Sequence, residues 1–246
     1  MSESYGAFAY AYDQALGHRF FRALRRILTT LLDRFPTPKK THLDIACGTG
    51  LVIDFFTTRG FRSVGVDLSL PMLQLARRRA RYRIAGDMRA LPVRGLFSRV
   101  TCLYDSLNHL KNMQDLRITF RAIADVMEDD ALLLFDVNHP DIYPAIWGND
   151  DPFVADGEGY HLEMATRYRS RDRIAHAMVT GWARLPTGER VEIREQREQR
   201  AYSERQIIDA LAAAALVPAE VIEFDPFGEG RNVKLFFVCQ HCKARS

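Results

Sequence analysis

The 246-residue chain is 47% hydrophobic and has a formal net charge of +3, a composition that suits a globular protein with a full core. No apolar run approaches the roughly 20 residues that cross a bilayer. The N-terminus has acids and polar residues where a signal peptide has a basic start and an apolar core. We therefore expect a soluble, cytoplasmic protein, and the charge is too mild to argue for nucleic acid binding.

The four cysteines predict thiols and not a disulfide framework. Cys47 and Cys102 lie inside apolar runs, which indicates reduced, core-packed side chains. Cys239 and Cys242 form a single CxxC near the C-terminus. A zinc site would need a second ligand pair at suitable spacing, which the sequence lacks, so we expect no metal.

Strands and helices alternate over the first part of the chain. Apolar residues at helical spacing predict a helix over residues 20–35. Ser69 is the expected N-cap of a later helix. Alternation of this kind predicts a parallel sheet with helices on both faces. The strands are expected at residues 41–46, 63–67, 82–87, 99–105 and 131–137, and the further helices at 50–60, 69–80 and 113–127.

The pattern changes after Asn138. Polar and apolar residues alternate in three runs (160–169, 173–185 and 190–200) that turn-like segments join. This predicts a three-stranded antiparallel meander inserted into the α/β domain. We expect the α/β domain to comprise residues 1–138 and 201–246, and the inserted subdomain residues 139–200.

The C-terminal part returns to the α/β pattern. A helix is predicted over residues 203–216, with Ser203 and Gln206 at capping-box spacing. The link between the strands at 219–224 and 233–239 is short enough to permit only a hairpin, so the last strand should run antiparallel to its neighbours. The fold expected is α/β, with a doubly wound, mostly parallel seven-stranded sheet and an antiparallel last strand.

The loop after the first strand predicts a ligand site. In a doubly wound sheet, ligands bind beyond the carboxyl ends of the strands. Gly48 and Gly50 allow tight backbone conformations and close approach of a ligand. Asp67 ends the second strand, where an acid can accept hydrogen bonds from both ribose hydroxyls. Together these features predict an adenosine-type cofactor.

The same loop argues against a dinucleotide. The dinucleotide fingerprint has a third glycine where this chain has Ile53, and Asp44 before the loop would repel a pyrophosphate. A carboxylate there favours a cationic ligand, such as S-adenosylmethionine, which has a sulfonium and an ammonium and no phosphate. The alternative is that the two glycines only form a turn.

Four ordered motifs resemble those of the class I S-adenosylmethionine-dependent methyltransferases, which share a Rossmann-like fold. They are LDIACGTG, VGVDLSLPML, AGDMRALP and VTCLYDSLNHL, and the resemblance covers most of the chain. It implies S-adenosyl-L-methionine as cofactor and S-adenosyl-L-homocysteine as product.

The resemblance also implies a role for individual residues. Many family members have glycine where this chain has Ala46, which asks for slightly more room without breaking a polar contact. The implied contacts are Asp44, Ala46 and Gly48 around the amino-acid end, Gly50 in the same loop, Asp67 at the ribose, Leu68, Met72, Asp87 and Met88 around the adenine, and Tyr104 near the sulfonium.

Two stretches resemble parts of small-molecule N-methyltransferases. Residues 5–16 are similar to an aromatic segment that folds over the cofactor, with Tyr5 and Tyr12 as its lid residues; a frayed end with core aromatics is the alternative. The inserted meander resembles the substrate-covering sheet of amino-sugar and glycine N-methyltransferases. It could equally form a dimer contact, which would make the protein a homodimer.

The resemblance implies methyl transfer to a small-molecule amine or hydroxyl. Such transfer depends on positioning and exclusion of water, and an acceptor can also need a base. The candidate catalytic residues are His109, Asp105 and His139, which follow the fourth and fifth strands. Each single histidine is more often a packing or hydrogen-bonding residue, and some family members rely on proximity alone.

Two other functions stay open. A methyltransferase acting on RNA or protein would require the arginines of residues 77–83 and 167–173 to form one face with the active-site mouth. A non-catalytic protein that binds S-adenosylmethionine would show tight binding without turnover.

Overall fold

The computed structural model describes the backbone of residues 3–148, 151–226 and 233–242, and the side chains of these ranges from Ala7 onward. A seven-stranded sheet with the order β10-β11-β5-β4-β1-β2-β3 forms its centre. All neighbouring strands are parallel except β11, which runs antiparallel to β5 and to β10. The predicted fold class and the antiparallel last strand are therefore confirmed. The strands are β1 (Thr41–Ile45), β2 (Arg62–Asp67), β3 (Tyr82–Ala85), β4 (Phe97–Cys102), β5 (Met127–Asn138), β10 (Leu216–Phe224) and β11 (Lys234–His241).

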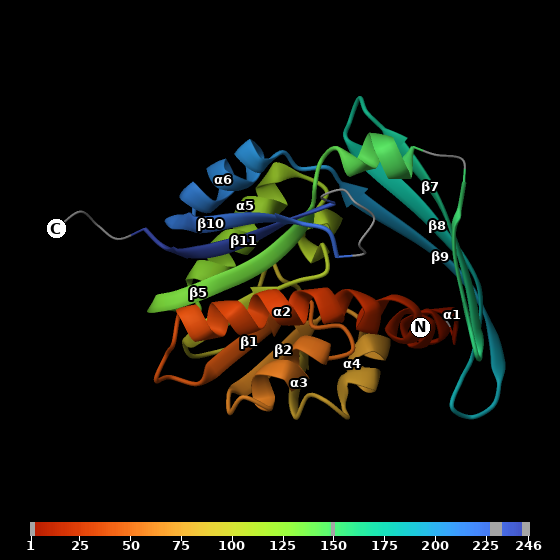
Figure 1. The fold of residues 1–246 in the computed structure, drawn as a ribbon, viewed down its shortest axis with the longest axis horizontal. Helices are drawn as coiled ribbons and strands as arrows, with labels where there is room; N and C mark the ends of the chain where they lie inside the picture. Colours follow the sequence, from red (N-terminus) through yellow and green to blue (C-terminus); the bar gives the residue numbers. More distant parts are fainter. Residues whose placement is uncertain (1–2, 149–150, 227–232, 243–246) are drawn as a thin grey trace.

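Helices cover both faces of this sheet (Figure 1). α5 and α6 pack on one face, and α2, α3 and α4 belong to the layer on the other. Ser69 caps α4 through a hydrogen bond from Met72 N–H, and Ser203 and Gln206 form the predicted capping box of α6. The helix bounds are α1 (Glu3–Tyr12), α2 (His18–Arg34), α3 (Leu51–Thr57), α4 (Leu70–Ala76), α5 (Met113–Ala124) and α6 (Glu204–Ala212), with short helices η1 (Asp13–Gly17), η2 (Ser106–His109) and η3 (Tyr143–Trp147).

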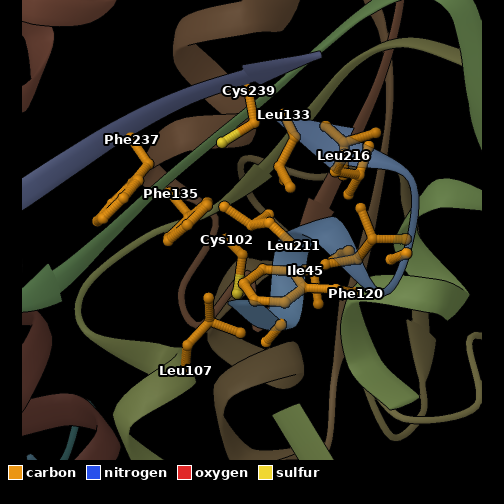
Figure 2. Close-up of a cluster of buried hydrophobic side chains, with 14 of the residues drawn as sticks. Ile45, Cys102, Leu107, Phe120, Leu133, Phe135, Leu211, Leu216, Phe237 and Cys239 are labelled. Carbon is orange, nitrogen blue, oxygen red and sulfur yellow. The ribbon is translucent and has the colours of Figure 1, made fainter. Parts of the chain in front are cut away.

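The larger core lies between the sheet and the layer of α5 and α6. Figure 2 shows side chains from β5, β11 and both helices in contact there, with Phe135 and Phe237 stacked at a ring distance of 4.7 Å. Cys102 and Cys239 are fully buried in this cluster, and Cys47 is buried beside α3 and α4. Their burial confirms the prediction of core-packed thiols for Cys47 and Cys102. It also places the first cysteine of the CxxC inside the sheet.

The inserted segment forms a separate antiparallel sheet of four strands, one more than the sequence predicted. The three predicted strands are β7 (Tyr160–Arg169), β8 (Ile174–Arg184) and β9 (Arg190–Arg200), and β6 (Phe153–Gly157) adds an edge by pairing with β7. β6 is short and mostly exposed, so its side chains do not show the alternating pattern from which the other three were predicted.

The N-terminal helix α1 joins the two sheets. Phe8 and Ala11 pack against Leu162 and Val179 on the inner face of the inserted sheet. In Figure 1, α1 lies beside β7, β8 and β9, and the inserted sheet stands over the end of the main sheet. The helix therefore helps to form a chamber between the two sheets. No helix within the described ranges is both long and apolar enough to cross a membrane.

Candidate functional site

A cavity of about 1090 Å³ opens where the carboxyl ends of the parallel strands face the inserted sheet. Among the predicted site residues whose side chains the structure describes, Gly50 and His139 lie outside its lining. The other predicted residues meet around one cavity because parallel strands bring the loops after each strand to one edge of the sheet. The predicted residues that line the cavity are Tyr12, Asp44, Ala46, Gly48, Asp67, Leu68, Met72, Asp87, Met88, Tyr104, Asp105 and His109.

The loop after β1 has three residues with left-handed backbone, Ala46 at φ 55°, Gly48 at φ 53° and Gly50 at φ 84°. Glycine adopts this conformation freely, whereas alanine loses about 1–2 kcal/mol in it. The alanine at position 46 thus differs from a glycine in conformational strain as well as in the room it needs. At Gly50 a Cβ would also lie 3.3 Å from the Arg79 Cβ and 3.4 Å from the Ala76 Cβ, so this glycine lets the end of α4 and the turn after it approach the loop.

Asp67 fastens this loop to the end of β2. One carboxylate oxygen accepts a hydrogen bond from Gly48 N–H at 2.7 Å, and the other accepts one from Ser69 N–H, also at 2.7 Å. Burial raises the pKa of Asp67, although these two hydrogen bonds oppose the shift. Each carboxylate oxygen has a second lone pair, so Asp67 can still accept hydrogen bonds from two hydroxyls in the cavity. Leu68 beside it is 75% exposed, at the edge of the cavity.

Asp44 is the most unusual ionisable group of the cavity wall. Its side chain is 2% exposed, one carboxylate oxygen accepts a hydrogen bond from the Thr101 hydroxyl at 2.5 Å, and the other oxygen has no hydrogen-bond partner among the described residues. Burial raises the pKa of Asp44 to about 7. A buried carboxylate with a free oxygen is stabilised by a cation, so this position fits an ammonium group.

Asp87 and Met88 lie after β3 at the rim. The Asp87 carboxylate pairs with the Arg89 guanidinium at 2.6 Å, and this partner lowers the pKa of Asp87. Arg89 also reaches Asp115 at 3.3 Å. An adenine amino group would therefore share the Asp87 carboxylate with Arg89.

Tyr104 and Asp105 form a tight turn after β4, and both have left-handed backbone, at φ 60° and 49°. Asp136 of β5 holds this turn, because its carboxylate accepts hydrogen bonds from Tyr104 N–H at 2.6 Å and Asp105 N–H at 3.0 Å. The Tyr104 hydroxyl donates to the carbonyl of Gly17 at 3.1 Å. The end of β4 is thereby tied to β5 and to the N-terminal segment.

A buried lysine lies between Asp105 of this turn and Asp136 of β5. The ammonium of Lys234, at the start of β11, contacts the Asp105 carboxylate and lies 3.1 Å from an Asp136 oxygen and 4.9 Å from the centre of the Phe20 ring. Gln199 of β9 donates to the other Asp105 oxygen at 2.5 Å. Lys234 is 4% exposed, and the two acids raise the pKa of its ammonium against the effect of burial. Asp105 thus belongs to an ionic cluster on the cavity wall.

The two candidate histidines occupy different surroundings. His109 lines the cavity, and its Nδ1 lies 2.9 Å from the Glu198 carbonyl oxygen. Burial lowers the pKa of its imidazole. His139 lies outside the lining, and its Nδ1 accepts a hydrogen bond from Asp141 N–H at 3.3 Å. His109 is therefore the histidine that the fold brings to Asp105.

The N-terminal segment covers the cofactor loop. Tyr12 lines the cavity, and burial raises the pKa of its hydroxyl, which stays protonated. Asp13, the first residue of η1, accepts hydrogen bonds from the Thr49 hydroxyl of the loop and from Arg79 at 3.0 Å. The side chain of Tyr5, the other expected lid residue, lies outside the described residues.

Sequence reasoning missed Lys234, Asp136, Gln199 and Asp13. Lys234 and Asp136 had a local signal, since each is a charged residue in an otherwise apolar strand. Gln199 lies in a polar run and Asp13 in an unpatterned segment, so neither stood out. Their partners are far away in the sequence, and only the fold brings them together.

The donor set fits S-adenosylmethionine. Asp44 offers a buried carboxylate oxygen that lacks a partner, and Asp67 offers acceptors beside a loop with left-handed backbone. A cation, a ribose and an adenine edge could be held by Asp44, Asp67 and the residues after β3, respectively.

Comparison with known proteins agrees with this geometry. Residues 43–130 match the family described as "Methyltransferase domain". A putative methyltransferase of Geobacillus sp. (strain WCH70) is 33% identical over 142 residues, which are 55% of this chain and 58% of the relative. The dTDP-3-amino-3,6-dideoxy-alpha-D-glucopyranose N,N-dimethyltransferase of Streptomyces fradiae is 33% identical over 110 residues, 44% of this chain and 43% of the relative. The match thus spans about half the length of these curated relatives.

A solved structure extends the similarity of fold to nearly the whole chain. The S-adenosylmethionine-dependent methyltransferase from Clostridium acetobutylicum ATCC 824 superposes with a TM-score of 0.79 at 21% identity, covering 95% of this chain and 97% of that chain. Residues 43–130 thus match a methyltransferase domain, and the chain shares the fold of this solved structure over nearly its whole length.

Proposed function

We propose that the protein transfers a methyl group from S-adenosylmethionine to the nitrogen of a small-molecule amine. One observation carries the proposal: a single cavity has the partnerless carboxylate oxygen of Asp44 on the wall at β1 and the Asp105 carboxylate on the wall at β4. The first suits the ammonium of the cofactor and the second suits an acceptor amine. The sugar-amine relative from Streptomyces fradiae supports nitrogen as the acceptor atom.

When bound, S-adenosylmethionine supplies an electrophilic methyl group on a sulfonium. The residues of this chain would position the two reactants and exclude water, which is the main requirement of such a transfer. Tyr12, Tyr104 and Asp105 line the cavity, and Asp105 can accept a hydrogen bond from the acceptor nitrogen. His109 has a lowered pKa and is therefore neutral at pH 7, so it can take up the proton that the amine loses.

Titration calorimetry with S-adenosylhomocysteine tests the cofactor assignment, with NADH as control. We expect saturable binding of the first compound alone. Binding of NADH, or of neither compound, would contradict the proposal at its first step. Mass spectrometry of amines and the corresponding alcohols incubated with S-adenosylmethionine then tests the acceptor atom, and methylation of the alcohols alone would exclude nitrogen.

Replacing Asp67 by alanine should weaken S-adenosylhomocysteine binding about a hundredfold. Each charge-assisted hydrogen bond to a ribose hydroxyl contributes about 1.5–3 kcal/mol. The loop also loses its anchor, since Asp67 holds Gly48 N–H and Ser69 N–H. Calorimetry measures the change, with Asp54→Ala on the exposed face of α3 as matched control. Unchanged affinity in a folded Asp67→Ala variant would remove Asp67 from the site.

Replacing Arg79 by methionine should release the N-terminal segment from the cofactor loop. Arg79 donates to the Asp13 carboxylate at 3.0 Å and to the Thr49 carbonyl at 3.2 Å, and its loss leaves the 7%-exposed Asp13 without its cation. We expect faster proteolytic cleavage near residue 13 and an affinity for S-adenosylhomocysteine about tenfold lower. The exposed neighbour Arg78, replaced in the same way, is the control. Equal cleavage rates in the two variants would show that Arg79 does not hold this segment.

Two observations favour a small acceptor over RNA or a protein. The cavity is covered by α1 and the inserted sheet, so an acceptor must enter a chamber. The arginines of residues 77–83 follow α4 at the lower edge in Figure 1, while those of 167–173 surround the turn between β7 and β8 near the upper edge. Salt-independent turnover of a small amine would agree with this choice.

A homodimer through the inserted sheet stays a prediction, which light scattering can test.

A further inference from the structure

The strand order divides the cavity into two halves. The half at β1, β2 and β3 contains the residues assigned above to the cofactor. The half at β4, β5 and β11 faces the inserted sheet and η3, and we call it the acceptor chamber. Asp105, Met164, Ala177, Val179, Gln199 and Lys234 are among the residues that line it.

Most of the chamber wall is apolar. Met164 and Val179 are cross-strand partners on the inner face of the inserted sheet, and Ala177 lies two residues along the same face. Trp147 of η3 and Val233 before β11 add to this wall. Such a surface stabilises a bound ligand in proportion to the apolar area that the ligand buries.

The polar end of the chamber has an excess of acid. Asp105 and Asp136 share the single ammonium of Lys234, and Gln199 adds only a neutral donor. Asp105 is the member of this pair that lines the cavity, whereas Asp136 is fully buried behind it. A cation placed against Asp105 would therefore neutralise the negative charge that the single Lys234 ammonium leaves uncompensated.

The cations of the chamber already have acidic partners. Lys111 contacts Glu198, and the Arg197 guanidinium lies 3.6 Å from Glu195 and over the Phe8 ring. Lys234 is engaged by the two aspartates. Arg19 at the cavity also has an interaction partner within the chain. A phosphate in the chamber would have to displace one of these partners to reach a cation. An uncharged apolar group needs no cation and displaces none of them.

We infer that the acceptor is a small amine with an apolar body and no phosphate, bound with its ammonium against Asp105 and its body against Met164, Ala177 and Val179. The inference rests on the proposed function and adds the substrate class to it. It separates this chain from the relatives named for dTDP-linked amino sugars, whose two phosphates find no unpaired cation among the described residues of this chamber.

The test titrates butylamine, hexylamine and octylamine into the protein, with and without saturating S-adenosylhomocysteine, and repeats this with the alcohols of equal length. We expect affinity to rise about fourfold per methylene group, and each amine to bind at least about tenfold more tightly than its alcohol. A flat dependence on chain length, equal binding of amines and alcohols, or tighter binding of a dTDP-linked amino sugar than of octylamine would overturn the inference.

Matched variants locate the binding surface. Met164→Gln should halve the gain per methylene, whereas Met178→Gln, the same change on the opposite face of the neighbouring strand, should leave it unchanged. Asp105→Asn should remove the preference for amines over alcohols. Equal effects of the two methionine changes would overturn the assignment of the wall. If S-adenosylhomocysteine does not bind, the proposed function fails, and the titration of the cofactor-free protein still reports on the chamber.

Discussion

Replacing Asp44 by asparagine should make the unliganded protein more stable at pH 8 and remove most of its affinity for S-adenosylhomocysteine. The carboxylate is 2% exposed, and one of its oxygens has no partner. Its ionised form is therefore stabilised less in the folded protein than in the unfolded chain. A neutral side chain of similar shape avoids this cost, and its carbonyl oxygen can still accept the hydrogen bond from Thr101.

The pH dependence has a definite sign. The pKa of Asp44 rises from 3.8 to about 7 on folding, so the cost of ionising it is absent below pH 3.8 and complete above pH 7. This rise corresponds to about 4 kcal/mol. The amide of an asparagine would leave a buried donor unpaired, which costs about 1–3 kcal/mol at every pH. We expect Asp44→Asn to be about 1–3 kcal/mol more stable than the wild type at pH 8 and less stable at pH 4.

Urea unfolding of both proteins at the two pH values measures this reversal, with Asp54→Asn as the exposed control. Calorimetry on the same samples should show an affinity for S-adenosylhomocysteine lower by about a hundredfold, because loss of one partner of a buried charge pair costs on the order of 3 kcal/mol. A variant that is less stable than the wild type at both pH values would mean that ionised Asp44 does not destabilise the folded protein. Retained affinity would show that its partner is not the cofactor.

Much of the main sheet was predictable because its signals are local. The apolar runs of buried strands, the Ser69 cap and the Ser203–Gln206 capping box each depend on neighbouring residues, and the structure confirms them. The short final link permitted only a hairpin, which gave the antiparallel β11. β6 was missed because an edge strand of five mostly exposed residues has no buried face to impose alternation.

The site likewise has one part that local sequence patterns predict and one part that they do not. The loop after β1 and the acid after β2 belong to motifs whose spacing is visible in the sequence, and the fold brings Gly48 and Asp67 within hydrogen-bond distance. The cluster at Asp105 is different, because Lys234 lies 129 positions away and Gln199 lies 94 away. No local pattern records such pairings. Lys234 and Asp136 were local hints, since each is a charged residue in an otherwise apolar run, but their pairing could not be predicted without the packing of β11 against β5.

Replacing Lys234 by methionine should therefore destabilise the protein by about 3–5 kcal/mol at pH 8, the range for removing one partner of a buried ion pair. The ammonium is the shared counter-ion of Asp105 and Asp136, and methionine keeps an unbranched apolar stem while it removes the charge. Arg205→Met is the control, since Arg205 pairs with Asp209 at 3.2 Å and their side chains are 86% and 53% exposed; we expect it to cost at most about 1 kcal/mol.

The loss in Lys234→Met should shrink as the pH falls. Burial already raises the pKa of Asp136, and without the ammonium the neighbouring Asp105 carboxylate raises it further. A group with a raised pKa takes up a proton in the folded state as the solution is acidified, and this relieves the repulsion between the two acids. Urea unfolding at pH 5 and pH 8 should thus give a smaller difference from the wild type at pH 5. An equal loss at both values would mean that the lysine acts by packing alone and that Asp105 has no excess charge with which to bind an amine.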